Sequence, residues 1–394
     1  MEVPTEYHGR EQSFLKHRVL KEYLLRWGRK LGSLSRRGPL RLWYVDCFAG
    51  PWSSRSPSLE DTSIHIGVHA LAEAAATWRT AGHDIEVNAV FVEANRNAFE
   101  TLRDHLASLG GPVKTYALHG EFGQQVDAIA GLLRADPAFI FVDPTGFKGA
   151  AMSFIAPLVE RRVRDVLVNV MFEHINRWKD DPREFLREQM REFFGLEDGN
   201  LVPGLSEAEL FELYRENLKG RCGLKYAADL AVPHPTKDRT WFHLVVGGNH
   251  HETLHVFRDV EISVIATEAA RVRDSASKRR HEERTGQIAL ALDTAAPVDR
   301  RFEAKYRIDD ASLADLLIAA LGSSPRRFDG VWPALLEAHH VTRAQVAHVA
   351  RDAEASGRLM IEREKSSTRR PLPKDADILR RLDPEDPVAR SSPP

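Results

Sequence analysis

The sequence predicts a doubly wound α/β domain over about residues 40 to 260, and three observations predict it. Short runs rich in β-branched and aromatic residues alternate with segments of helical periodicity. Several runs, such as 89–92 and 138–142, are entirely apolar, as in a parallel sheet covered by helices on both faces. An acidic residue stands at or just after the end of four successive runs. Together these features indicate a Rossmann-like sheet, whose ligands bind at the carboxyl ends of the strands.

The predicted strands and helices follow one another in a regular order. The expected strands cover residues 42–47, 87–92, 113–118, 138–142 and 166–171. The expected helices between them cover residues 64–80, 95–109, 122–133 and 150–161. An amphipathic helix precedes the first strand, with apolar side chains every four positions at Leu15, Val19, Tyr23, Trp27 and Leu31.

The second half of the chain departs from this alternation. Residues 180–220 favour a helical insertion, and the β-rich runs 225–232 and 240–246 predict an antiparallel hairpin that closes the edge of the sheet. Beyond Ile308 three short helical segments precede a β-rich run and a basic turn at 363–370. That order is typical of a winged helix-turn-helix.

These patterns divide the chain into five parts. They are an N-terminal helical segment (1–38), a Rossmann domain with the insertion (39–262), a basic helical linker (263–307), a winged-helix-like domain (308–376) and a disordered tail (377–394).

Composition limits the classes of function. The chain has 55 Lys and Arg against 57 Asp and Glu, a formal charge of −2, so a basic surface for nucleic acid would have to be local. Its two cysteines, Cys47 and Cys222, lack the spacing of a zinc site or a disulfide framework, and its 17 histidines lack a recurrent metal-ligand spacing. We expect no metal, a cytoplasmic location and no membrane span, because no stretch approaches about 20 apolar residues.

Acidic residues at the strand ends are the main candidates for binding. Asp46 precedes a Gly-containing turn where backbone can approach a ligand. Glu93 ends the second strand, where a carboxylate can accept both hydrogen bonds of a ribose diol. Glu121 follows the third strand, within reach of an adenine amino group, and Asp143 ends the fourth. Taken singly, each acid is as well explained as a helix cap; taken together, they favour a nucleoside-containing ligand.

The expected site has two parts. The residues expected to bind a cofactor are Asp46, Phe48, Ala49, Gly50, Glu93, Glu121 and Phe122. The residues expected to contact the reacting groups are Asp143, Pro144, Asn169 and Arg177. Two common nucleotide sites are excluded, because the sequence after the first strand has neither the Gly-x-Gly-x-x-Gly fingerprint nor the Gly-Lys-Ser/Thr of a P-loop.

Six short stretches carry a family resemblance across most of residues 14–260. They are Lys16-His17 with the helix of Tyr23, Leu24 and Trp27, then 44–51 (YVDCFAGP), 60–64 (EDTSI), 91–93 (FVE), 141–144 (FVDP) and 169–177 (NVMFEHINR). On these stretches the chain resembles the bacterial three-Cys-motif partner protein (TcmP) family, which is similar to class I S-adenosylmethionine (SAM) methyltransferases. The resemblance implies a fold of that type, SAM as cofactor and a partner protein that bears a three-cysteine motif.

Two positions depart from the usual methyltransferase pattern. Trp52 stands where a second glycine is usual, and its indole would either line the cofactor pocket or fill it. The sequence Asp143-Pro144-Thr145-Gly146 shares only its first two residues with the Asp-Pro-Pro-Tyr type, in which the acid accepts hydrogen bonds from the target amine and a ring stacks on the base. Phe147 is the ring nearest in sequence.

Two hypotheses follow. In the first, the chain is a SAM-dependent methyltransferase, with DNA or RNA as a candidate substrate, and catalysis comes mainly from positioning. In the second, it is a non-catalytic, methyltransferase-like partner protein that binds nucleic acid. The phosphate contacts would then come from Arg358, Arg363, Lys365, Arg369 and Arg370.

Overall fold

A computed structural model describes most of the chain. The described residues are 3–50, 54–56, 59–160, 163–197, 199, 201–234, 237, 239–286, 308–363 and 371–382. The chain forms two compact units, Met1–Asp299 and Arg300–Pro394. None of the described helices combines the length and apolar character that crossing a bilayer requires.

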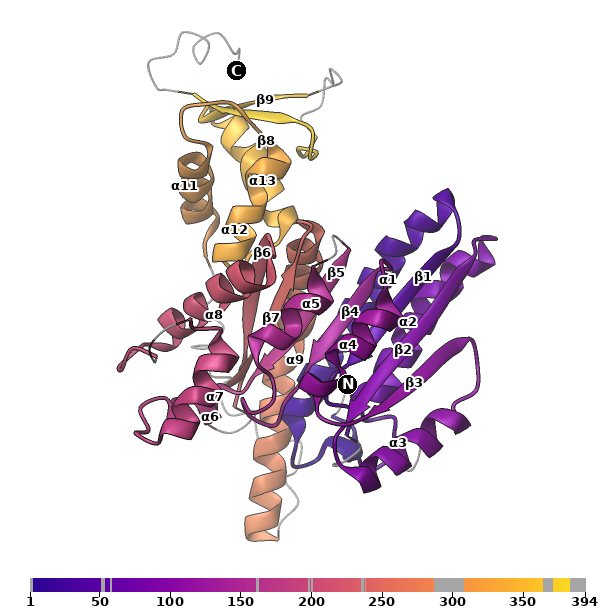
Figure 1. Cartoon of the computed structure of the whole chain (residues 1–394). Helices are drawn as coiled ribbons and strands as arrows, with labels where there is room; N and C mark the ends of the chain where they lie inside the picture. The colour runs from indigo at the N-terminus through magenta and orange to yellow at the C-terminus, as the bar shows by residue number, and fades with distance from the viewer. Residues whose placement is uncertain are drawn as a thin grey trace. The chain divides into compact units, whose positions relative to one another are not determined.

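The first unit is built on a seven-stranded, mostly parallel sheet (Figure 1). Its strands are β1 (Leu40–Asp46), β2 (Ile85–Glu93), β3 (Val113–His119), β4 (Ala138–Val142), β5 (Arg164–Val170), β6 (Tyr226–Pro233) and β7 (Thr240–Gly248). They lie in the order β3-β2-β1-β4-β5-β7-β6, with β1 to β5 parallel and the β6–β7 hairpin antiparallel. The predicted strands and edge hairpin are confirmed, and the sheet is consistent with a Rossmann-like methyltransferase fold.

Helices connect these strands. They are α1 (Glu11–Gly32), α2 (Ser63–Thr80), α3 (Arg96–Ser108), α4 (Phe122–Leu133), α5 (Met152–Val159), α6 (Phe172–Trp178), α7 (Glu184–Phe194), α8 (Glu207–Cys222) and α9 (Glu252–Thr285), with short 3₁₀ turns η1 (Thr5–Tyr7) and η2 (Ser33–Arg37). The insertion predicted at 180–220 contains α7 and most of α8, and α6 precedes it. Residues 263–285, expected as a linker, continue the helix that begins at Glu252.

Each face of the sheet is covered by its own helices. Because side chains alternate along a strand, Tyr44 and Phe139 face α1, where the Tyr23 ring lies 5.2 Å from Phe139. Their neighbours Val45 and Ile140 join the core on the other face, formed with α4, α5, α7 and α8. All the apolar side chains named here are buried, so the sheet has no wet face in this region.

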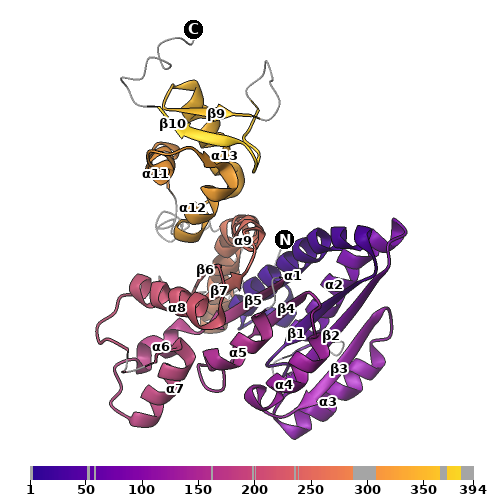
Figure 2. The same ribbon diagram turned by 45° about the horizontal axis from the view of Figure 1, so that its top comes forward.

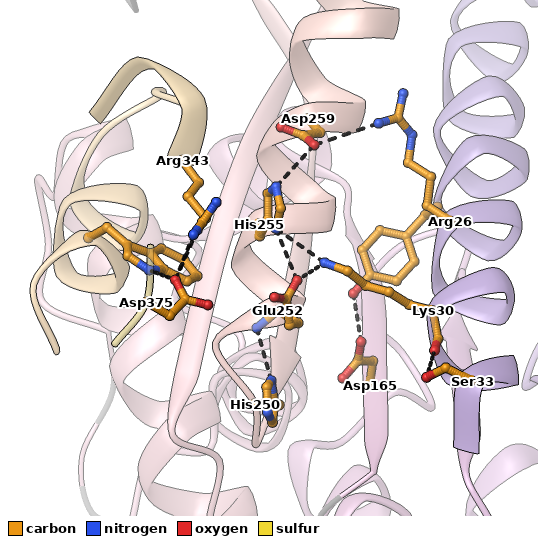
Figure 3. Close-up of polar contacts among 12 residues, drawn as sticks. Arg26, Lys30, Ser33, Asp165, His250, Glu252, His255, Asp259, Arg343 and Asp375 are labelled. Carbon is orange, nitrogen blue, oxygen red and sulfur yellow. Dashed lines mark hydrogen bonds and ion pairs between the residues drawn. The ribbon is translucent and has the colours of Figure 1, made fainter. Parts of the chain in front are cut away.

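Polar contacts fasten α1 between the sheet and α9 (Figure 3). Tyr23 Oη donates to Asp165 Oδ2 on β5 at 2.7 Å, and burial raises the pKa of that carboxyl to about 6. Lys30 forms an ion pair with Glu252 at the start of α9. About two turns further along α9, Asp259 lies 3.7 Å from Arg26. Contacts spaced along the whole helix hold α1 in one register on the sheet.

Within its described residues, 308–363 and 371–382, the second unit contains three α-helices and a small antiparallel sheet. Its elements are α11 (Asp310–Leu321), β8 (Arg326–Arg327), η3 (Phe328–Gly330), α12 (Trp332–Ala338), α13 (Arg343–Ala355), β9 (Leu359–Glu362) and β10 (Ile378–Arg381), with strand order β8-β10-β9. Figure 2 shows β9 and β10 side by side. Asp375, before β10, accepts from Trp332 Nε1 at 3.1 Å and from Arg343 Nη2 at 2.8 Å, which ties this loop to α12 and α13 (Figure 3).

The prediction of a disordered tail from residue 377 is wrong for the strand β10. Leu379 is fully buried and pairs with Ile361 of β9. The polar composition of the tail concealed this strand, because its stability comes from a partner strand distant in sequence. The basic turn at 364–370 and the last residues, 383–394, lie outside the described residues.

We predict opposite effects on stability for two glycine-to-alanine substitutions. A Cβ added at Gly67 of α2 would lie 2.1 Å from the Tyr44 ring, so Gly67→Ala should lower the free energy of unfolding by about 1–3 kcal/mol. A Cβ at Gly131 of α4 meets nothing within 4 Å, so Gly131→Ala should raise it by about 0.5–1 kcal/mol. Urea denaturation measures both. Equal stability of the two variants would contradict the close packing of α2 on β1.

Candidate functional site

The candidate site lies where the strand order reverses. The chain runs from β1 to β2 and β3 on one side and from β4 to β5 on the other, and β1 and β4 are neighbours. Ligands of such sheets bind beyond the carboxyl ends of the strands at this point. Asp46 pairs in register with Phe141, so Asp143 lies just beyond the level of Asp46. The loops after β1 and β4 therefore flank one crevice.

Asp46 shapes the loop after β1 from inside. Its carboxylate is fully buried and accepts from Phe48 N and from Tyr44 Oη, both at 3.2 Å. Burial raises its pKa to about 6. The loop is also fastened to both neighbouring strands, because Cys47 N donates to Phe141 O at 2.9 Å and Ala49 N to Val92 O at 2.8 Å. Asp46 thus positions loop backbone, and its burial does not favour direct contact with a ligand.

The rest of this loop is only partly described. Phe48 is half-buried, and Gly50 is the last residue described before a gap. Trp52, the departure from the usual methyltransferase loop, lies outside the described residues.

Glu93 lies at the end of β2 with its carboxylate largely buried, 5% exposed. Asn95 N donates to Glu93 Oε1 at 2.5 Å, and burial raises the pKa of the carboxyl. Gly120 N donates to Glu93 O at 3.0 Å, which joins the end of β3 to the same edge. Glu93 is thus a carboxylate at the strand edge whose donors in this structure are backbone N–H groups.

Glu121 has a different role from the one expected. It is the N-cap of α4 and forms a capping box with Gln124, whose Oε1 accepts from Glu121 N at 3.2 Å. Capping is the simpler explanation that the sequence left open, and the structure favours it over contact with adenine. Phe122 is buried, and its ring packs 5.8 Å from Phe48 and 5.9 Å from Phe154. Phe122 therefore packs against Phe48 of the loop after β1.

Three residues distant in sequence meet at the end of β4. Lys16 Nζ of α1 lies 2.5 Å from Asp143 Oδ2, and Asn169 Nδ2 of β5 donates to Asp143 Oδ1 at 2.6 Å. The side chains of Lys16 and Asp143 are only 13% and 16% exposed. We call Lys16, Asp143 and Asn169 the switch-point cluster. Sequence reasoning from the strand ends missed Lys16, and only the stretch Lys16-His17 of the family resemblance pointed to it.

The switch-point cluster contains an unsatisfied acceptor. The amide nitrogen of Asn169 donates to the carboxylate of Asp143, so the amide oxygen, Oδ1, needs a different partner. This oxygen is buried and has no hydrogen-bond partner among the described residues. A buried polar atom without a partner costs about 1–3 kcal/mol. In a native structure it points to a ligand or to a water molecule.

The start of α1, which carries Lys16, is held rigidly. His17 Nδ1 lies 2.9 Å from Tyr7 Oη, and burial holds the pKa of His17 well below its usual value. Glu11 accepts from Arg279 Nε of α9 at 2.9 Å. Arg10 forms an ion pair with Asp61, which follows the loop after β1. Asp61, in the stretch 60–64, thus has a physical role as the ion-pair partner of Arg10. Together these contacts fix the position of the first turns of α1, which carry Lys16.

The other predicted residues are not members of the switch-point cluster. Pro144 is buried beside Asp143, and Phe147 lies in the core, so its ring is not free to stack on a base as suggested. Arg177 is exposed on α6, and its expected contact with substrate has no support in this geometry. His174 of the same helix lies near the loop after β4. A Cβ atom added at Gly146 in that loop would be 3.5 Å from His174 Nδ1. The sequence contained no signal for His174 beyond the family stretch.

A second buried polar group lies under the edge hairpin. His243 of β7 lies between Asp229 at 2.7 Å and Glu207 at 2.9 Å, and its ring stacks 3.4 Å from Phe211. The two carboxylates raise the pKa of His243 against its burial. This group fastens the start of α8 to the sheet, and sequence patterns could not reveal it, because its members lie far apart in the chain.

A pocket of about 590 Å³ lies in the insertion and not at the strand ends. Its lining residues are Lys179, Asp180, Arg187, Met190, Leu201, Val202, Pro203 and Gly204. Lys179 Nζ donates to Leu205 O at 2.7 Å and Arg187 Nε to Asp181 O at 3.2 Å, so both cations support the local backbone. The chemistry of the switch-point cluster gives a better candidate site than the size of this pocket.

We predict that Asp46→Asn changes how stability depends on pH. A carboxyl whose pKa rises from 3.8 to about 6 on folding stabilises the fold at low pH, and this contribution is lost as pH rises through about 6. Relative to the variant, the wild type should therefore lose about 1 kcal/mol of unfolding free energy between pH 5 and pH 8. Denaturation at both pH values measures this, with exposed Asp127→Asn as control. Parallel pH profiles of wild type and Asp46→Asn would refute the assignment.

Comparisons with known proteins add little to this geometry. No family model matches the sequence, and none of the curated proteins matches it either. Membership of the three-Cys-motif partner family therefore stays a prediction from the stretches quoted above.

Several solved structures are similar at a low level. A Legionella pneumophila protein assigned to the family model DUF519 has 12% identity and a TM-score of 0.34, over 64% of this chain and 91% of that one. Loganic acid methyltransferase with SAH has 10% identity and a TM-score of 0.28, over 72% and 92%. A Podospora anserina methyltransferase with SAH has 13% identity and a TM-score of 0.24, over 58% and 86%. Similarities this low carry no argument, and the assignment of the fold rests on the strand order.

Proposed function

We propose that this chain is a SAM-dependent methyltransferase that methylates an amine held at the switch-point cluster. The observation that carries the proposal is the buried, unsatisfied Asn169 Oδ1 beside the ion-paired carboxylate of Asp143. Two hydrogen-bond acceptors at the carboxyl edge of a doubly wound sheet, next to the strand-order reversal, suit a donor such as an amino group. A carboxylate at the end of the second strand, Glu93, supplies the binding group for a ribose.

The residues at the sheet edge fit the proposed cofactor. The donors to the buried Glu93 carboxylate are backbone N–H groups of Ala94 and Asn95, and a ribose diol would add two O–H donors. The loop after β1 presents backbone at Phe48, Ala49 and Gly50, with Asp46 fixing its shape. When bound, SAM supplies a methyl group on a positively charged sulfur. The chain itself must hold ribose and acceptor in line and exclude water.

The acceptor would be oriented by Asp143 and Asn169. Lys16 places a positive charge 2.5 Å from Asp143 Oδ2 and so fixes the carboxylate whose oxygens would accept the hydrogen bonds. An amino group that donates to Asp143 and to Asn169 Oδ1 turns its lone pair away from both. As the nitrogen gains a methyl group it gains positive charge, which the carboxylate stabilises before a proton leaves. Positioning and electrostatics thus account for the reaction without a separate nucleophile.

A nucleic-acid substrate is the finer part of the proposal. The amine chemistry at Asp143-Pro144 suits a nucleobase amino group. The second unit, with helices α11, α12 and α13 and an antiparallel sheet, supports a winged-helix interpretation. Its expected phosphate contacts have weaker support: Arg358 lies 2.5 Å from Asp315, and Arg363 lies 2.7 Å from Glu354.

The other basic residues of the nucleic-acid hypothesis lie outside the described residues. Lys365, Arg369 and Arg370 lie in 364–370 and are still proposed as phosphate contacts. A three-Cys-motif protein remains the proposed partner, and it rests on the family resemblance alone. The non-catalytic, nucleic-acid-binding hypothesis is the alternative, and it would leave the acceptor at Asn169 Oδ1 to a water molecule.

Glu93→Gln tests the cofactor. Replacing the carboxylate removes charge-assisted hydrogen bonds to the ribose, worth about 1.5–3 kcal/mol, so the Kd for SAM measured by calorimetry should rise by roughly 10- to 100-fold. Glu100→Gln on the exposed side of α3 is the matched control and should leave the Kd unchanged. If wild-type protein binds neither SAM nor its demethylated product, the proposed function fails.

Asp143→Asn and Lys16→Met test the acceptor site. Neither residue is assigned to the cofactor, so SAM affinity should stay within about threefold. Transfer of label from methyl-labelled SAM to a cell extract should fall by about 100-fold or more, because the acceptor loses its orientation. Separating the extract into nucleic acid and protein tests the substrate class. Label in the protein fraction alone would refute the nucleic-acid substrate, and undiminished transfer by both variants would refute the role of the cluster.

A further inference from the structure

The insertion contains a pocket whose residues have no part in the proposed methyl transfer. Its volume of about 590 Å³ is within the roughly 300–1,000 Å³ that is usual for small-ligand sites. The residues after α6, the helix α7 and the loop at 201–204 supply the lining, and Figures 1 and 2 show α6 and α7 next to each other. The pocket therefore has the size of a site for a small molecule.

Part of the lining is apolar. Met190 and Leu201 are only 3% and 8% exposed. Val202, also in the lining, is 65% exposed, which makes it the most exposed large hydrophobic side chain among the residues that the structure describes. Covering such a side chain is favourable, because it removes apolar surface from water. These residues favour a ligand with an apolar body.

Two half-buried cations in the lining have no acid to pair with. Lys179 Nζ donates to Leu205 O at 2.7 Å, and Arg187 Nε donates to Asp181 O at 3.2 Å. Within the described part of the chain neither side chain forms an ion pair, and Arg187 Nη1 and Nη2 have no acceptor there. A cation that is partly removed from water and lacks a counter-ion favours an anion as ligand.

The acids near these cations do not take the place of such a ligand. Both carboxylate oxygens of Asp181 accept from Arg183, at 2.9 Å and 3.0 Å. Asp180 also lines the pocket, but it is exposed, so water and salt screen its charge. The lining therefore keeps two cations against one acid.

The charge of the surrounding segment limits the size of the anion. Residues 172–204 contain five Lys and Arg against eight Asp and Glu. This excess of acids repels a long polyanion such as a nucleic-acid strand, whereas a single anionic group meets only the charges of the pocket. The pocket thus suits a small molecule with one anionic group.

We propose that this pocket binds a small organic anion, whose carboxylate or phosphate group is held by Arg187 and Lys179 and whose apolar body covers the apolar part of the lining. A guanidinium binds either group through two parallel N–H donors. The site goes beyond the proposed function, because none of its residues is assigned to SAM or to the acceptor amine. Lys179 directly follows α6, which begins at Phe172, shortly after Asn169 of the switch-point cluster. A bound anion would therefore stabilise the segment that follows β5.

Fluorescence titration with 8-anilinonaphthalene-1-sulfonate, an apolar ring system that carries one anionic group, tests the site in the full-length protein. One equivalent should bind. Decanoate and decyl phosphate, kept below their micellar concentrations, should displace the probe, and the more effective of the two identifies the anionic group. Decanol, which has no charge, and inorganic phosphate, which has no apolar body, should displace it roughly tenfold less well.

Variants of the two cations test the anion contact. Arg187→Gln and Lys179→Gln should each raise the Kd of the probe by roughly tenfold, because each removes a charge-assisted hydrogen bond. Arg187→Lys keeps the charge and should bind more tightly than Arg187→Gln. Arg191→Gln is the matched control, since Arg191 lies on the same helix, 3.6 Å from Glu188, and outside the lining; its Kd should equal that of the wild type. Circular dichroism and the Tm verify that each variant folds.

Three outcomes would overturn the proposal. The first is a wild type that does not bind the probe, and the second is an unchanged Kd in both Arg187→Gln and Lys179→Gln. The third is displacement by decanol as effective as that by the two anions, which would show a purely apolar site. The measurements contain no SAM, so failure of the proposed methyltransferase function leaves their result unaffected.

Discussion

The packing of α1 on the sheet is the contact on which the candidate site depends. Tyr23 reaches through to Asp165 on β5, and further along the helix Lys30 binds Glu252 of α9. At the opposite end the same helix brings Lys16 to Asp143. Because contacts along the whole helix set its position, a shift of α1 by one turn, about 5.4 Å, would separate Lys16 from the carboxylate. The site is therefore as rigid as this interface.

The strand ends at the reversal combine two kinds of acid. Asp46 and Glu121 serve the backbone, one by shaping the loop after β1 and the other by capping α4. Glu93 and Asp143 lie at the ends of β2 and β4 and are the two acids proposed to bind ligand groups. This division explains how four acids at consecutive strand ends belong to one region although only two are proposed to bind. The unsatisfied Asn169 Oδ1 adds a local cost in stability, as is usual where a site is prepared for a ligand.

Much of the fold was predictable, because it is encoded in local patterns. Short, nearly continuous apolar runs predicted the strands of the sheet, and turn residues between two β-rich runs predicted the hairpin at its edge. The strand β10 was not predictable, since Leu379 is buried only through pairing with a distant strand. In the site, Asp143 and Asn169 were identified from their strand ends, whereas Lys16, His174 and the His243 group were not. Their positions depend on how helices pack on the sheet, which periodicity does not specify.

By itself, then, the sequence determined the order of strands and helices, the two-faced burial of the sheet and the acids at its edge. These follow from hydrophobic periodicity and the direction of parallel strands, which are properties of neighbouring residues. Only the tertiary structure decided which cation of α1 reaches Asp143. That outcome depends on the distance between two residues 127 positions apart, and packing alone sets such a distance.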